Sequence, residues 1–151
     1  GSPLSLDLSG GSAILLSMKT FILIRGVPGS GKSTLAKALA VGWTSQGAKV
    51  AGPFEADDGM VDGYGNYKFN PKILGLCHAA CLFDVRRAMN EGVNVVIQSN
   101  TNTKHWEYKK YLDAAKEFGY TVQIITVDGD FENTHGVPAD KVAEMRERFE
   151  K

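Results

Sequence analysis

The feature that most constrains this chain is a glycine-rich segment that fits the pattern of a phosphate-binding loop. Its nine residues are Gly26, Val27, Pro28, Gly29, Ser30, Gly31, Lys32, Ser33 and Thr34. The apolar run 21–24 before it predicts a buried strand, and the segment 35–40 after it predicts a helix. Because a glycine-rich turn that opens a helix points backbone N–H groups at an anion, all nine residues are predicted to bind the phosphates of ATP or another nucleoside triphosphate.

Two side chains of this loop carry specific chemistry. Lys32 is a movable cation suited to the β- and γ-phosphates, which makes it a candidate catalytic residue. Ser33 offers a hydroxyl to Mg²⁺, the metal that accompanies nucleotides in such loops. The alternative, a chance glycine-rich turn before a helix, is disfavoured by the strand and helix on either side.

Length and charge limit the remaining possibilities. A chain of 151 residues predicts one domain, which we place at 18–151, and residues 1–17 resemble an added or disordered leader that precedes Met18. Basic and acidic side chains balance at 17 each, which argues against a broad electrostatic grip on a long duplex. A local groove for a short strand or a nucleic-acid end remains compatible with this balance.

Cysteine usage and hydropathy favour a cytoplasmic protein. Cys77 and Cys81 lie four residues apart in a predicted helix, a spacing that suits two small buried side chains better than a disulfide. No apolar run is long enough to cross a membrane, so no membrane partner is expected. The three histidines show no metal-ligand spacing.

Strands and helices alternate along the chain, which predicts an α/β protein with a mostly parallel central sheet of four to five strands between two helical layers, the three-layer arrangement of a kinase-type P-loop NTPase. Strands are expected at 21–24, within 49–55, at 93–97 and at 120–127, and further helices from 70, at 104–118 and at 138–150. Ligands of such sheets bind at the carboxyl ends of the strands. Three polar clusters should meet there: the glycine-rich loop, Asp57–Asp58 and Ser99–Thr103.

The second and third clusters supply candidates for the rest of the chemistry. Asp57 is the candidate general base for an acceptor hydroxyl, and it could instead hold Mg²⁺; Asp58 is a weaker candidate at the acceptor, and both could simply cap local backbone. Asn100 and Asn102 could contact the acceptor or cap the helix that follows. No acid lies between 98 and 103, where P-loop enzymes often place an aspartate for Mg²⁺. Asn133 and His135 lie in a late loop that is a candidate lid, and both are candidate acceptor or lid residues.

With these motifs in order, the chain resembles the polynucleotide-kinase-like branch of P-loop kinases, which includes phage and bacterial 5′-hydroxyl polynucleotide kinase domains and small phage kinase-like AAA ATPases. The resemblance covers 18–151. Its carriers are the loop 26–34, Glu55–Asp58, Tyr67–Pro71, His78, Ser99–Thr103, Trp106, Glu107, Gly119, Tyr120 and Asn133–Pro138.

The resemblance implies ATP- and Mg²⁺-dependent phosphorylation of a 5′-hydroxyl on a single-stranded or exposed nucleic-acid end, with Asp57 as the base. Two positions depart from the family pattern: Met60 replaces an acceptor-binding arginine, and Glu132 precedes Asn133 where a lid arginine is common. Arg146, on the expected last helix, is the candidate to contact the phosphates instead. The resemblance does not define an oligomeric state.

Two other functions stay open at this point. The missing acid after the third strand and the lid without arginine are compatible with a nucleotide-binding module that has little or no phosphotransfer activity. The neutral charge and the short lid are compatible with a kinase for a nucleoside or another small molecule.

Overall fold

The computed structural model describes residues 17–27, 29–56 and 71–127, together with residues 145, 147 and 149. The described elements are β1 (Thr20–Arg25), α2 (Lys32–Ser45), β2 (Val50–Phe54), α3 (Pro71–Asn90), β3 (Val95–Gln98), α4 (His105–Glu117) and β4 (Thr121–Thr126). In this part of the chain, no helix is both long and apolar enough to cross a membrane.

The four strands form one parallel sheet in the order β2-β3-β1-β4. At the centre of the sheet, Ile22 of β1 pairs with Ile97 of β3 on one side and with Gln123 of β4 on the other. The chain runs from β1 outward to β2 and β3, and then returns past β1 to β4. This reversal places the expected ligand crevice at the carboxyl ends of β1 and β3.

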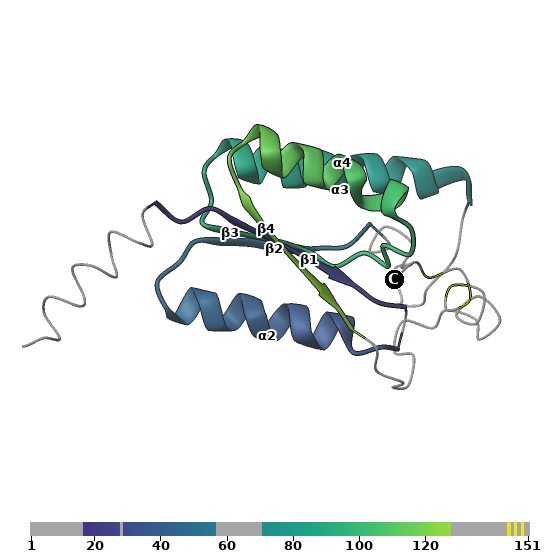
Figure 1. Cartoon of the computed structure of the whole chain (residues 1–151), viewed down its shortest axis with the longest axis horizontal. Coiled ribbons are helices and arrows are strands. Elements are labelled where there is room, and N and C mark those ends of the chain that lie inside the picture. Colours follow the sequence, from purple (N-terminus) through teal and green to yellow (C-terminus); the bar gives the residue numbers. More distant parts are fainter. Residues whose placement is uncertain are drawn as a thin grey trace, which may run out of the picture.

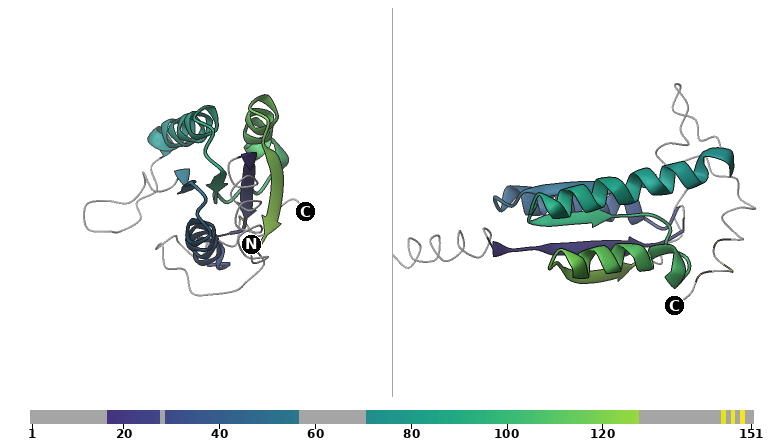
Figure 2. Two further views of the ribbon diagram at one scale, coloured as in Figure 1. Left: turned by 90° about the vertical axis from the view of Figure 1, so that its left-hand side faces the viewer. Right: turned by 90° about the horizontal axis from the view of Figure 1, so that it is seen from above.

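Helices cover both faces of the sheet, with α2 on one face and α3 and α4 on the other (Figures 1 and 2). The side chains of β1 alternate between the two cores because successive residues of a strand point to opposite faces. Phe21 and Leu23 pack in the core beneath α3 and α4, whereas Ile22 and Ile24 pack in the core beneath α2. All four are fully buried, which explains why β1 is a continuous apolar run.

This arrangement confirms the predicted three-layer α/β fold with a parallel sheet, and the sheet contains four described strands. The third strand begins at Val95, two residues later than predicted, and Asn94 before it uses its side chain to join neighbouring backbone segments. Its Oδ1 accepts a hydrogen bond from the Lys49 amide at 2.9 Å, and its Nδ2 donates to the Met18 carbonyl at 3.1 Å. The helix predicted at 138–150 and the leader at 1–17 fall almost wholly outside the described residues.

A glycine in β2 occupies a backbone position that leaves no room for a side chain. Gly52 has φ +101°, and a Cβ there would overlap the Ile97 carbonyl oxygen and lie 2.9 Å from the Phe54 amide nitrogen. Because both neighbours are backbone atoms, Gly52→Ala is expected to lower the free energy of unfolding by about 2–3 kcal/mol. Urea unfolding followed by circular dichroism would measure this change.

The same substitution in α2 provides a matched control. Gly42 lies inside the helix, and a Cβ there would meet no atom within 4 Å. Gly42→Ala is therefore expected to raise the free energy of unfolding by about 1 kcal/mol, the helix preference of alanine over glycine. Equal effects of the two substitutions would contradict the backbone conformation described for β2.

Candidate nucleotide-binding site

The loop after β1 has the backbone that an anion site requires. Gly29 and Gly31 have φ values of +85° and +96°, which side-chain-bearing residues rarely adopt. Gly31 is the residue before the first turn of α2, and it makes no side-chain cap to that turn. The first turn of α2 thus has no side-chain cap from this residue, and helix N-termini of this kind bind phosphate through their backbone amides.

A buried hydroxyl in the loop also fits a phosphate ligand. Ser30 Oγ is buried, and within the described residues it has no hydrogen-bond partner. It lies so close to Gly26 that a Cβ at position 26 would overlap it and would also lie 3.1 Å from the Val127 carbonyl oxygen. Since an unsatisfied buried hydroxyl is costly, an oxygen-rich ligand in the loop would recover a lost hydrogen bond.

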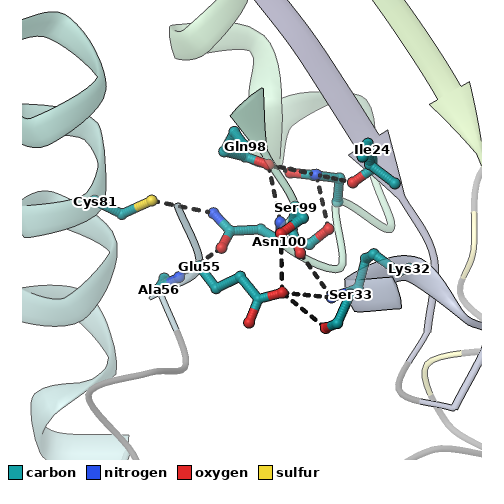
Figure 3. Close-up of polar contacts among 10 residues, drawn as sticks. Ile24, Lys32, Ser33, Glu55, Ala56, Cys81, Gln98, Ser99 and Asn100 are labelled. Carbon is teal, nitrogen blue, oxygen red and sulfur yellow. Dashed lines mark hydrogen bonds and ion pairs between the residues drawn. The ribbon is translucent and has the colours of Figure 1, made fainter. Parts of the chain in front are cut away.

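Lys32 is buried at the start of α2 and reaches across the sheet edge (Figure 3). Its Nζ donates a hydrogen bond of 2.6 Å to the backbone carbonyl of Ser99, immediately after β3. The same Nζ lies 3.8 Å from a carboxylate oxygen of Glu55, immediately after β2. The phosphate loop and the carboxyl ends of β2 and β3 therefore meet, as the sequence predicted for two of the three polar clusters.

Glu55 is the residue at this junction that the sequence analysis did not single out as a site residue. Its Oε1 accepts hydrogen bonds from Ser33 Oγ and from Ser99 Oγ, each at 2.9 Å (Figure 3). Its side chain is only 10% exposed. The available signal was its position directly after the second strand, two residues before Asp57, where an acid faces the phosphate loop.

The segment after β3 is held by its own amide side chains. Asn102 adopts φ +53°, and its Nδ2 donates to the Ile24 carbonyl at 3.0 Å and to Gln98 Oε1 at 2.8 Å. Asn100 Oδ1 accepts the Ala56 amide at 2.6 Å, which ties β2 to this segment one residue before Asp57. Both asparagines are buried, so they shape the sheet edge from within.

The start of α4 is secured by Thr103 and Glu107 instead of these asparagines. Glu107 Oε2 accepts from Thr103 Oγ1 at 2.6 Å, and Glu107 Oε1 accepts from the Thr103 amide at 3.2 Å. The capping alternative considered for Asn100 and Asn102 is therefore wrong, because α4 has no side-chain cap and the two asparagine side chains bond to β1, to β3 and to Ala56 instead.

Arg25 joins the base of the phosphate loop to the same segment. Although it is buried, its Nε donates to the Asn102 carbonyl at 2.9 Å and one terminal nitrogen donates to the Thr103 carbonyl at 3.2 Å. The guanidinium lies 5.0 Å from the ring centre of Tyr108 and 4.5 Å from that of Phe149. This contact set fixes β1 against the loop after β3, and the apolar pattern of β1 gave no hint of it.

Behind Asn100 lies a buried polar group on α3 and α4. Asn100 Nδ2 is 3.7 Å from Cys81 Sγ and 3.5 Å from Tyr111 Oη, and Tyr111 stacks on Phe21. Burial raises the pKa of Tyr111 far above its ordinary value of 10.0, and the neighbouring Cys81 adds to the increase. Of the two cysteines that the spacing predicted to be buried, Cys81 is buried and Cys77 is only partly buried.

The raised pKa of Tyr111 predicts a loss of stability in alkali. The folded protein disfavours the phenolate form of Tyr111. The stability that the neutral side chain contributes is therefore fully present below about pH 10, and it is lost above that pH as Tyr111 ionises in the unfolded chain. The free energy of unfolding of the wild type should fall more steeply above about pH 10 than that of Tyr111→Phe, by up to about 1.4 kcal/mol per pH unit. Chemical unfolding at stepped pH tests this. Between about pH 6 and 8, the free energies of unfolding of the wild type and of Tyr111→Phe should change with pH in parallel. Parallel change above about pH 10 as well would contradict the prediction.

Several predicted site residues lie outside the described part of the chain. These are Pro28, Asp57, Asp58, Asn133, His135 and Arg146. Asp57 nevertheless follows Ala56 directly, and Ala56 is buried at the same sheet edge. Among the described residues, no group of three or more His, Cys, Asp or Glu side chains could hold a metal by itself. A Mg²⁺ ion bound with nucleotide differs, since phosphates and water supply most of its ligands.

Fold and site together define the class of protein. A parallel sheet in this order, with a glycine-rich loop opening α2 and a lysine and serine at its start, is the architecture of a P-loop NTPase of the kinase type. The model of a family described as an AAA domain matches residues 21–135. The chain belongs to this AAA domain family.

Relatives and solved structures agree with this class. Human NEDD4-binding protein 2 is 30% identical over 139 residues, which are 86% of this chain and 8% of that protein. Kti12 of Chaetomium thermophilum, solved in complex with ADP-AlF3, has a TM-score of 0.60 at 13% identity over 87% of this chain and 80% of its own. The APS kinase CysC of Mycobacterium tuberculosis has a TM-score of 0.50 at 13% identity, and the match covers 89% of this chain and 99% of that structure's chain.

Proposed function

We infer that this chain is an ATP-dependent kinase that transfers the γ-phosphate to a hydroxyl, most specifically the 5′-hydroxyl of a polynucleotide end. The observation that carries this proposal is a set of contacts at one sheet edge, which join Lys32, Ser33, Glu55 and Ser99. Asp57 follows Glu55 by two residues. A bound γ-phosphate at the loop would thus have a cation beside it and a carboxylate close by in the chain, the two groups that phosphoryl transfer requires.

In the proposed reaction, the acceptor oxygen forms a bond to the γ-phosphorus while the bond to the β–γ bridging oxygen breaks and ADP leaves. Asp57 takes the proton of the acceptor hydroxyl. Lys32 and the loop amides stabilise the charge that develops on the phosphoryl oxygens. Mg²⁺ bound with the nucleotide would neutralise phosphate charge, and Ser33 would hold it; Asp57 is the alternative metal ligand if another group takes the acceptor proton.

The comparisons support the nucleotide more strongly than the acceptor. Kti12 was solved with ADP-AlF3, which resembles a phosphoryl group in transfer, and CysC is named as a kinase. Neither protein's name mentions a polynucleotide. The polynucleotide end is proposed from the resemblance carried by Glu55–Asp58 and Ser99–Thr103.

A transfer assay with γ-labelled ATP tests the acceptor class. The acceptors are single-stranded DNA and RNA with 5′-hydroxyl ends, nucleosides, and buffer alone, each with Mg²⁺. We expect label on the oligonucleotide ends. Label only on nucleosides would assign a small-molecule kinase instead. Nucleotide binding without any labelled product would favour the nucleotide-binding module.

A further inference from the structure

The carboxylate of Glu55 has no role in the reaction described so far, although it contacts the phosphate loop directly. One of its oxygens accepts hydrogen bonds from Ser33 Oγ and Ser99 Oγ, and the same oxygen lies 3.8 Å from Lys32 Nζ (Figure 3). Residues of α2 and of the segment after β3 therefore converge on one partly buried acid that follows β2. Withdrawing a carboxylate from water, even in part, costs free energy unless charge and hydrogen bonds compensate it. The position of Glu55 therefore calls for a functional explanation.

The hydrogen bond from Ser33 decides which part of that hydroxyl faces a ligand. A serine hydroxyl has one proton and two lone pairs. Here the proton is donated to Glu55, so Ser33 Oγ can meet a cation only with its lone pairs, as a metal ligand must. Glu55 thus orients Ser33 as a metal ligand, in the way that carboxylates behind metal ligands generally do.

The sheet order supplies a second, independent argument. No acid follows β3 between 98 and 103, where a Mg²⁺-directed aspartate is common in P-loop enzymes. β2 lies beside β3, with Phe54 opposite Gln98, so the residue after β2 reaches the same edge. Glu55 is that residue, and its contact with Ser99 Oγ shows how close the two strand ends are.

We propose that Glu55 is the protein carboxylate of the Mg²⁺–nucleotide site, acting through the Ser33 hydroxyl and through metal-bound water. This rests on the proposed function, because it assumes that nucleotide phosphates occupy the loop. Glu55 is therefore a positioning residue, and it takes the place of the acid that is missing after β3.

The same carboxylate should make nucleotide binding depend on the metal. Without Mg²⁺, its negative charge opposes the approach of the phosphates and attracts Lys32. With Mg²⁺, that charge is neutralised and favours the complex. Removing the charge should consequently have opposite effects on ATP affinity in the two conditions, and a purely structural role of Glu55 would not produce this result.

Calorimetric titration of a non-hydrolysable ATP analogue, with excess EDTA and with increasing Mg²⁺, tests the proposal. The variant is Glu55→Gln, which keeps an acceptor oxygen for both serines, and the control is Glu91→Gln, an exposed acid after α3. We expect the gain in affinity caused by Mg²⁺ to fall about tenfold or more in Glu55→Gln. In EDTA, this variant should bind the analogue at least as tightly as the wild type. Glu91→Gln should match the wild type.

Other results would overturn the assignment in distinguishable ways. An unchanged Mg²⁺ gain, or an equal loss of affinity with and without Mg²⁺, would show that Glu55 has no metal role while leaving the kinase proposal intact. A wild type that binds no nucleotide would overturn both proposals. If Glu55→Gln does not fold, Glu55→Asp, which keeps the charge but shortens its reach, should lose part of the Mg²⁺ gain; a full gain in that variant would count against the proposal.

Discussion

Lys32→Ala is expected to abolish measurable phosphoryl transfer and to weaken ATP binding. The ammonium group lies between the Ser99 carbonyl and the Glu55 carboxylate, at the start of the helix that the phosphates would approach. Loss of a preorganised charge at the transferred group lowers rates by about 10³-fold. Loss of charged hydrogen bonds to the phosphates should weaken ATP affinity by about tenfold or more. Transfer assays and calorimetry would measure the two effects.

Lys37→Ala is the matched control for this prediction. Lys37 lies on the same helix and is exposed to solvent. It should change neither the rate nor the affinity. Folding of Lys32→Ala must be checked by thermal unfolding, because Glu55 loses its neighbouring cation. A folded Lys32→Ala that binds ATP and transfers phosphate like the wild type would contradict the site.

Asp57→Asn is expected to reduce transfer by about 10²–10⁴-fold, the usual contribution of a general base. The amide is nearly the same size as the carboxylate but cannot take the acceptor proton. ATP affinity should stay unchanged, since Lys32 and the loop amides bind the phosphates. Parallel measurement of single-turnover transfer and of ATP binding separates the two effects.

Asp113→Asn tests whether loss of any carboxylate has this effect. Asp113 is exposed on α4, where it pairs with Lys109 at 2.9 Å. The control variant should transfer phosphate at the wild-type rate. Retained transfer in Asp57→Asn would remove Asp57 from the role of base, and a parallel loss of ATP binding would indicate a metal or structural role instead.

The fold was predictable because its signals are local. Phe21–Ile24 is buried on both faces of the sheet, so the run is continuous in the sequence. Gly29 and Gly31 of the loop have the positive φ values that a glycine-rich turn favours. Alternation of strands and helices then required a parallel sheet with helical layers on both faces, and the structure has this arrangement.

The contacts that complete the site were less predictable because they join distant parts of the chain. Nothing in the sequence near Glu55 indicates that its partners are Ser33 and Ser99, which are 22 and 44 residues away. The burial of Arg25 and the left-handed backbone of Asn102 were unpredictable for the same reason, since both depend on how β1 meets the segment after β3. Residue types alone could not separate an acceptor-binding asparagine from one that holds the loop.

The most direct test of the kinase proposal compares two oligonucleotides that differ only at the 5′ end. One carries a 5′-hydroxyl and the other a 5′-phosphate, and both are incubated with γ-labelled ATP, Mg²⁺ and the wild-type chain. Our proposal predicts stable label on the 5′-hydroxyl strand alone, at its terminal nucleotide. Label on neither strand, or equal label on both, would contradict phosphorylation of a 5′-hydroxyl end.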